Sequence, residues 1–110
     1  MVWRIQDRTT FETLRRDGQR SRRGPITVTY ASVGTPPAPR VAYAVGKRVG
    51  GSVVRNRVRR RLRAAVAGID GLAPGAYLVS AGPAAVVMAY EELRSAVVSA
   101  MTAAWTKGQQ

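Results

Sequence analysis

The residues with the clearest chemical capacity lie in one short segment, 55–63. Six arginines occupy these nine positions, together with one asparagine, Asn56. Guanidinium groups bind phosphates through paired hydrogen bonds, and an amide both donates and accepts, which suits a base edge or a ribose hydroxyl. On a helix in water, so much like charge lowers stability, so it is expected where a polyanion is the partner. The segment therefore predicts a nucleic-acid surface.

The charge distribution supports this interpretation. The chain carries 18 Lys and Arg against 6 Asp and Glu, a formal net charge of +12. Residues 1–63 hold 16 of the basic side chains, whereas residues 64–110 hold 2. A protein face that is only solvent-exposed usually carries both positive and negative side chains, but no acidic residue occurs between Asp17 and Asp70. The basic half is thus the predicted binding half.

Side chains suited to catalysis by the protein alone are absent or scattered. The chain has no cysteine and no histidine, which removes thiol chemistry, the commonest general base and the commonest metal ligand. Magnesium-dependent hydrolysis would need clustered carboxylates, and the basic half offers only Asp7, Glu12 and Asp17. We expect no catalytic residue, no metal ligand and no cofactor bound by the protein.

A helix is predicted to carry the arginine-rich segment. From Ser52 to about Ala67, apolar residues recur at helical spacing and form one stripe: Val54, Val58, Leu62, Ala65 and Val66. Most of the basic residues lie outside this stripe. A glycine-containing turn with Lys47 and Arg48 precedes the helix, so its first backbone N–H groups can meet an anion.

The other elements are predicted from caps, alternation and turn residues. A capping box of Thr9 and Glu12 indicates a short helix from about Thr10 to Asp17, followed by a basic turn over 20–25. The other expected elements are strands at Ile26–Tyr30, Arg40–Val45 and Ala76–Ala81 and a last helix from Tyr90 to Trp105. The first two strands flank a loop at Gly34–Pro39 and should pair as a hairpin.

The expected architecture is a single α+β domain spanning residues 1–110. Its order is helix, strand, strand, helix, strand, helix, with helices covering one side of a small, mostly antiparallel sheet. We expect residues 1–6 and 107–110 to be loose. The chain shows neither a signal-peptide pattern nor a run of about 18 apolar residues, so we expect a cytoplasmic protein with no membrane partner.

The segment from Lys47 to Arg60 resembles the signature of the bacterial ribonuclease P protein subunit. That family is marked by an Arg-Asn-Arg helix, here Arg55 to Arg57, after a strand that ends in two basic residues. The resemblance extends across nearly the whole chain. It includes an N-terminal helix that carries Phe11 and ends in glycine, and a Tyr-Glu-Glu-Leu stretch from Tyr90 that opens the final helix.

The resemblance implies a division of labour within a ribonucleoprotein endonuclease of tRNA processing. The RNA subunit, with magnesium bound to the RNA, hydrolyses precursor tRNA to release its 5′ leader, and one protein binds one RNA. The implied RNA-subunit contacts are Lys47, Arg48, Arg55, Asn56, Arg57, Arg59, Arg60 and Arg63. A left-handed strand-helix-strand crossover around the basic helix is also implied, against the general preference for right-handed ones.

The resemblance further implies that the protein holds the single-stranded leader between the first helix and the sheet. Phe11 is then a candidate for stacking on a base, the alternative being a core residue that closes the helix. Family members commonly have aromatic residues at the Arg15 position and near Thr29, and an arginine before the proline of Gly82-Pro83. Here Arg15 could stack through its guanidinium plane, and Tyr30 could replace the strand aromatic.

Two other classes of protein share the charge. A structural RNA-binding protein, such as a ribosomal protein, would be equally basic without the ordered signature. A DNA-binding or membrane-surface helix is the third possibility, and the latter is disfavoured because the apolar stripe lacks aromatic anchors.

Overall fold

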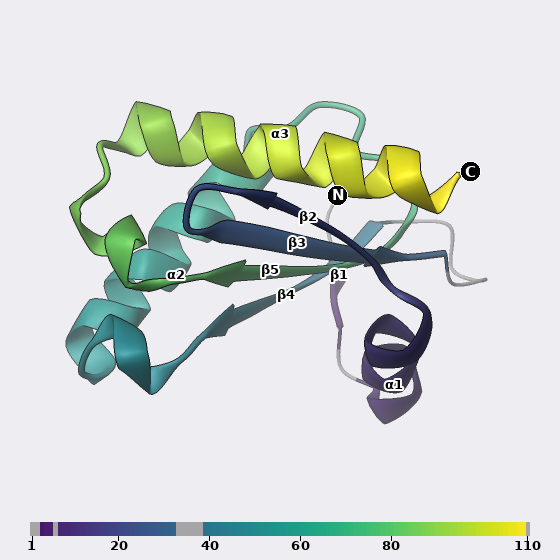
Figure 1. Ribbon diagram of the computed structural model, residues 1–110, viewed down its shortest axis with the longest axis horizontal. Coiled ribbons are helices and arrows are strands. Elements are labelled where there is room, and N and C mark those ends of the chain that lie inside the picture. The colour runs from purple at the N-terminus through teal and green to yellow at the C-terminus, as the bar shows by residue number, and fades with distance from the viewer. Residues whose placement is uncertain (1–2, 6, 33–38, 110) are drawn as a thin grey trace.

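The computed structural model describes residues 3–5, 7–32 and 39–109, which build a five-stranded mixed sheet (Figure 1). The strands are β1 (Trp3–Arg4), β2 (Gln19–Arg23), β3 (Ile26–Ala31), β4 (Pro39–Val45) and β5 (Gly75–Ala81). Their order across the sheet is β1-β4-β5-β3-β2. The β2-β3 and β3-β5 pairs are antiparallel, whereas β1-β4 and β4-β5 are parallel. The predicted sheet was mostly antiparallel, and the observed one is evenly mixed.

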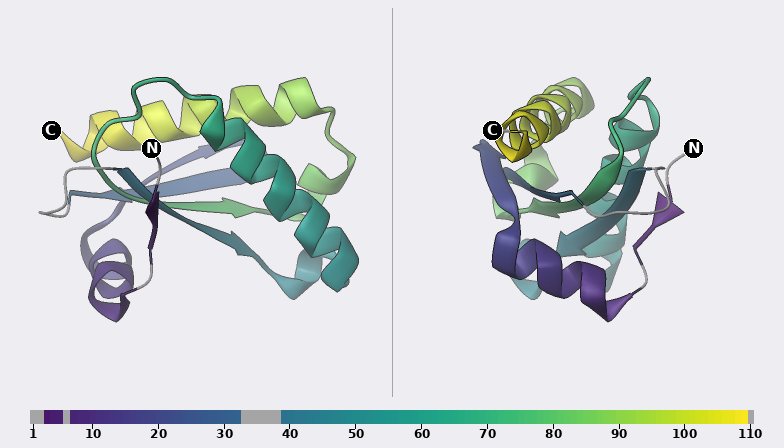
Figure 2. Two further views of the ribbon diagram at one scale, coloured as in Figure 1. Left: turned by 180° about the vertical axis from the view of Figure 1, so that it is seen from behind. Right: turned by 90° about the vertical axis from the view of Figure 1, so that its right-hand side faces the viewer.

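Within the described residues, three α-helices and two short 3-10 helices complete the α+β fold, which confirms the predicted class. The helices are α1 (Arg8–Asp17), α2 (Ser52–Ala67) and α3 (Tyr90–Gly108), with 3-10 helices η1 (Lys47–Val49) and η2 (Pro83–Val87). Helices α2 and α3 cover one face of the sheet and α1 lies on the other (Figure 2). Within the described part of the chain, no helix has the length and apolarity needed to span a membrane.

Alternation along the strands creates the main core between the sheet and the helix pair. Val28 of β3, Val41 of β4 and Val79 of β5 point to this side and are buried against Leu62 of α2 and Leu93 of α3. A smaller cluster on the opposite face holds α1 in place, and consists of Ile5, Leu14, Ala31 and Ala76. By register, the rest of that opposite face carries the small residues Thr27, Ala42, Ala44 and Ser80, the half-buried Leu78 and the exposed Arg20 and Arg22.

The connection from β4 through α2 to β5 is left-handed, as the resemblance implied. Viewed with α2 in front, β4 and β5 both run to the right and β5 lies above β4 (Figure 2, left). This hand runs against the strong general preference for right-handed crossovers. It brings α2 to the same side of the sheet as α3.

The predicted hairpin between the strands at 26–30 and 40–45 is wrong. β3 pairs with β2 on one side and β5 on the other, while β4 pairs with β5 and β1. The true hairpin partner, β2, was interpreted as a basic turn because four of its five residues are polar and exposed, and only Ser21 is buried. Gly24, with φ of +59°, makes the tight turn between β2 and β3.

The start of α1 also differs from the prediction. Asp7 caps the helix instead of Thr9, because its Oδ2 accepts hydrogen bonds from Thr10 N at 2.9 Å and Thr10 Oγ1 at 2.6 Å. Glu12 does not reach back to close a capping box and lies 3.9 Å from the Arg8 guanidinium. The helix therefore begins two residues earlier, at Arg8.

Parts of the segments expected to be loose belong to regular structure. Residues 3–4 form β1, and residues 107–108 lie in α3, where Lys107 Nζ donates to the backbone oxygen of Arg20 at 2.6 Å. Pro39, expected to end the Pro-rich loop, begins β4, and the predicted loop residues 34–38 lie outside the described residues.

Candidate nucleic-acid interface

The basic segment enters α2 through a turn that exposes backbone donors. Gly50 has φ of +153°, a conformation that favours glycine, and an added Cβ would lie 3.0 Å from the Val54 side chain. Gly51 caps α2 without a side-chain hydrogen bond, and Arg55 N makes the first bond to its oxygen, at 2.9 Å. The N–H groups before Arg55 have no partner within the helix. Lys47 and Arg48 are exposed beside them, so this turn favours an anion.

Around α2, the predicted contact residues lie outside the packed stripe and alternate there with exposed Val53 and Ala64. Val58, Leu62, Ala65 and Val66 are buried. At about 100° per residue, Arg59 and Arg63 fall on the flank toward β4, while Arg57 falls on the opposite flank. Among the predicted contacts on α2, Asn56, Arg57, Arg60 and Arg63 are exposed, and Arg55 and Arg59 are half-buried. The basic surface of α2 therefore extends from the flank that faces β4 to the opposite flank.

Arg59 connects this surface to the sheet. Its Nη1 donates to Asn56 Oδ1 at 2.9 Å, and its Nη2 donates to the backbone oxygen of Val45, at the end of β4, at 3.4 Å. Arg61, which was not among the predicted contacts, turns to the other flank and donates to the backbone oxygens of Ala85 and Met88. Arg61 therefore fastens α2 to the η2 region and has a structural role.

Arg63 stands over an aromatic ring of the neighbouring strand. Its guanidinium carbon lies 5.6 Å from the centroid of the Tyr43 ring, within the range of a cation–π contact. Burial raises the pKa of the Tyr43 hydroxyl, and the positive charge of Arg63 acts in the opposite direction. Tyr43 therefore stays neutral at physiological pH and offers an aromatic surface beside the arginines.

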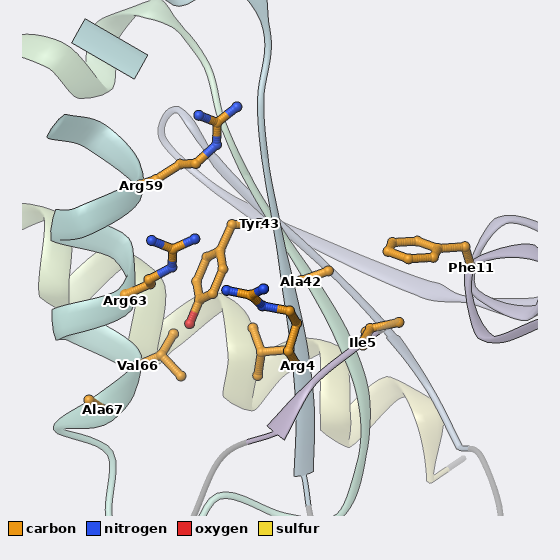
Figure 3. A pocket seen from close by; sticks show the side chains of 10 residues that line it. Arg4, Ile5, Phe11, Ala42, Tyr43, Arg59, Arg63, Val66 and Ala67 are labelled. Atoms are coloured by element: carbon orange, nitrogen blue, oxygen red, sulfur yellow. The ribbon is translucent and has the colours of Figure 1, made fainter. Parts of the chain in front are cut away.

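A groove follows the edge of β4 between α2 and α1 (Figure 3). It encloses about 440 Å³ and is lined by Arg4, Ile5, Phe11, Val41, Ala42, Tyr43, Arg59, Arg63, Val66 and Ala67. It forms because β1 pairs only with Arg40 and Val41, which leaves the next residues of β4 without a neighbouring strand among the described residues. The arginines enter from α2 and β1, and Phe11 faces the groove from α1 (Figure 3).

The groove contains two functional candidates that the sequence analysis missed, Arg4 and Tyr43. The signal that could have marked Tyr43 is an aromatic residue that alternates with two valines, Val41 and Val45, in the strand before the basic helix. Arg4 gave no signal, because the two-residue strand that places it is too short for alternation to show.

The four predicted leader contacts do not form one surface. Phe11 is 36% exposed and faces the groove, so it is not the core residue considered as its alternative, and Arg15 is exposed on α1. Thr29 points to the α1 side of the sheet but is only 7% exposed, packed close to Gly18.

Tyr30 lies on the other face of the sheet and is 3% exposed. Its hydroxyl donates to the backbone oxygen of Pro74 at 3.0 Å, and its ring centroid lies 5.0 Å from that of Tyr77. The ring packs against Gly75 and Gly108, where an added Cβ would lie 2.4 and 2.5 Å from its atoms. Tyr30 is therefore a core residue and does not replace an aromatic near Thr29 on the leader side, because neighbouring strand residues face opposite sides.

Helix α1, which carries Phe11, is fixed against the sheet by Asp7. The Oδ1 atom of Asp7 lies 3.2 Å from Arg40 Nη1, while its other oxygen caps the helix. The hydrogen bonds from Thr10, together with the charge of Arg40, hold the pKa of the Asp7 carboxyl below its ordinary value of 3.8. The carboxylate is thus ionised at neutral pH and joins the start of α1 to β4.

The three carboxylates of the basic half of the sequence, all at α1, lie beside arginines. Asp7 pairs with Arg40, Glu12 lies 3.9 Å from Arg8, and Asp17 lies 3.1 Å from Arg16. Within the described ranges, no group of three or more acidic side chains gathers in a way that could hold a metal ion.

Comparisons with known proteins identify the family. The family model described as Ribonuclease P matches residues 2–105. The ribonuclease P protein component of Acidothermus cellulolyticus is 38% identical over 95 residues, which cover 83% of this chain and 78% of that protein. The component from Thermobifida fusca is 37% identical over 109 residues, covering 91% and 74%.

Solved structures agree at the level of the fold. The ribonuclease P protein of Staphylococcus aureus superposes with a TM-score of 0.82 at 18% identity, covering 93% of this chain and 94% of that one. The protein from Thermotoga maritima gives a TM-score of 0.77 at 15% identity, covering 87% and 92%. A family match over almost the whole chain, with relatives above 30% identity, leads to one conclusion. This chain belongs to the ribonuclease P protein family and has its role in that ribonucleoprotein nuclease.

Proposed function

We propose that the chain binds the RNA subunit of ribonuclease P through η1, the glycine turn and α2. The observation that carries the proposal is the surface from Lys47 to Arg63. Its exposed cations surround the free backbone N–H groups at the start of α2, and the segment contains no acidic residue. A structured RNA presents a dense phosphate array, and neutralising it releases counterions. The proposed contacts are Lys47, Arg48, Arg55, Asn56, Arg57, Arg60 and Arg63, with Arg59 at the junction to β4.

We also propose that the 5′ leader of precursor tRNA passes along the α1 side of the sheet. By register, Thr27, Ala42, Ala44 and Ser80 face this side around the half-buried Leu78, and these four smaller side chains leave room for bases to lie flat. Phe11 offers an aromatic surface and Arg15 a guanidinium near this face. The groove at the β4 edge connects it to α2, so the leader and the RNA subunit would meet on one continuous surface.

Hydrolysis of the leader is assigned in this proposal to the RNA subunit, with magnesium held by the RNA. The support is chemical: the chain has no histidine or cysteine, and the carboxylates of its basic half lie beside arginines. The protein then supplies positive charge and a track for the single strand, in a complex of one protein and one RNA. We place this complex in the cytoplasm, without a membrane partner.

Reconstitution tests the proposal directly. The chain is mixed with a bacterial ribonuclease P RNA at low magnesium, and cleavage of precursor tRNA is followed over time. We expect stimulation by the protein and RNA binding that weakens steeply with salt, by about 0.7 to 0.9 counterions per phosphate contact. Absence of stimulation together with a salt-independent affinity would overturn the proposal.

A further inference from the structure

Arg59 differs from the exposed arginines of α2 because its guanidinium is hydrogen-bonded within the protein, and it differs from Arg61 because one of its partners is Asn56. Its guanidinium bridges Asn56 Oδ1, at 2.9 Å, and the backbone oxygen of Val45, at 3.4 Å. It is half-buried, whereas Arg60, the next residue, is exposed. The bridge links one turn of α2 to the last residue of β4, so the position of the Asn56 amide is set by the sheet as well as by the helix.

The bridge determines which end of the Asn56 amide reaches solvent. A guanidinium can only donate hydrogen bonds, so the amide must turn its oxygen toward Arg59. The Nδ2 group, with its two donors, then lies at the other end of an exposed side chain. An unrestrained asparagine rotates about its last torsion and offers either end, because that torsion is broad and nearly two-fold. Asn56 is therefore held as a donor.

We propose that Arg59 is a positioning residue that presents Asn56 to the RNA as a hydrogen-bond donor. The group recognised is an acceptor: a phosphate oxygen, a ribose oxygen, or a carbonyl oxygen or ring nitrogen of a base. This inference rests on the proposed binding of the RNA subunit. It changes the role of Arg59, which the sequence analysis counted as a direct contact, to one exerted through Asn56.

A double-mutant cycle on the whole chain separates the two roles. R59K keeps the charge, but an ammonium lacks the planar fork that reaches two acceptors at once. We measure affinity for a bacterial ribonuclease P RNA across a range of salt for wild type, R59K, N56A, the double variant and R60A. R60A serves as the matched control, because Arg60 is exposed and adjacent.

If Arg59 acts through Asn56, R59K and N56A each weaken binding by about fivefold, the usual size for one hydrogen bond. The double variant is then no weaker than N56A, and R59K keeps the wild-type salt dependence. R60A instead reduces the logarithmic salt slope by about 0.7 to 0.9, as expected for one lost phosphate contact. Wild-type affinity in R59K, or losses that multiply to about 25-fold in the double variant, would contradict the positioning role.

Two further measurements test whether the variants are folded and whether the Asn56 amide contacts the RNA. Because Arg59 also bonds Val45, thermal unfolding of each variant is recorded and binding is compared at a temperature where all are folded. If R59K does not fold, Arg59→Gln enters the same cycle.

The Asn56 side-chain amide signal is followed by NMR, and we expect it to shift when RNA is added to the wild type. An unchanged signal would overturn the donor role. If the wild type itself binds without salt dependence, the proposed function fails; if it binds steeply but the cycle is additive, only this inference fails.

Discussion

Helices α2 and α3 pack on the same face of the sheet, yet they use their polar side chains differently. Both bury an apolar stripe, centred on Leu62 in α2 and Leu93 in α3. In α3 the polar groups bond to β2, where Ser99 accepts from Arg23 at 3.0 Å and Lys107 donates to Arg20. In α2, Arg57, Arg60 and Arg63 are exposed, whereas Arg59 and Arg61 are hydrogen-bonded to other elements of the protein. The comparison teaches that half of the arginines of α2 are not used in packing and are available for a partner.

The largest predicted effect tests whether the two stripes are equivalent. Leu62 and Leu93 are both 0% exposed, so Leu62→Ala and Leu93→Ala should each lower the free energy of unfolding by about 2–5 kcal/mol. Urea denaturation followed by circular dichroism measures both. Val53→Ala is the control on the exposed side of α2, with an expected change within about 0.5 kcal/mol. A large loss in one helix only would show that the helices differ in packing as well as in charge.

Charge reversal separates the outer surfaces of the two helices. Arg57→Glu should weaken affinity for the RNA subunit by about tenfold or more and lower its salt slope, because a cation is lost and an anion is added. Arg94→Glu on α3 should change affinity by less than about threefold. Filter binding at several salt concentrations measures both, and far-ultraviolet circular dichroism checks that each variant is folded. Equal losses in the two variants would mean that total charge, and not the α2 surface, governs binding.

A third prediction distinguishes two arginines within α2. Arg61→Ala removes the donors to the backbone oxygens of Ala85 and Met88, so the free energy of unfolding should fall by about 1–3 kcal/mol. The salt slope of RNA binding should stay at the wild-type value, because Arg61 has turned toward η2. Arg57→Ala is the matched control, with the opposite pattern of normal stability and a reduced slope. A reduced slope for Arg61→Ala would place this residue among the phosphate contacts.

The smallest predicted effect concerns α1, which lies on the other face of the sheet from both helices. The folded pKa of Asp7 is below 3.8, so its contribution to stability is present above pH 3.8 and is lost as pH falls further, through the folded pKa. Asp7→Asn should remove this part of the acid sensitivity while leaving α2 and α3 intact. Thermal unfolding of the variant and the wild type is compared between about pH 2 and pH 5, a range that spans the titration of an aspartate carboxyl. Identical pH profiles would mean that the carboxylate does not hold α1 to β4.

The helices were predictable because their signals are local. The apolar stripe of α2 and the acidic first turn of α3 gave bounds close to those observed. Strand pairing was not predictable in the same way, since β3, β4 and β5 carry similar alternating sequences and the choice of neighbours depends on all of them together. The assignment of Tyr30 to the leader failed for a related reason: alternation defines two faces but does not say which one α3 covers.

The amino-acid sequence by itself determined the charge, the lack of histidine and cysteine, and the amphipathic basic helix, because each depends on residue type or on spacing along one element. The tertiary structure decided which arginines are free and which are engaged. Arg59 meets β4, Arg61 meets η2 and Arg63 meets Tyr43, all across contacts between elements. The groove at the β4 edge likewise exists only because β1 stops after two residues. Such contacts depend on distances in space, which spacing along the chain does not encode.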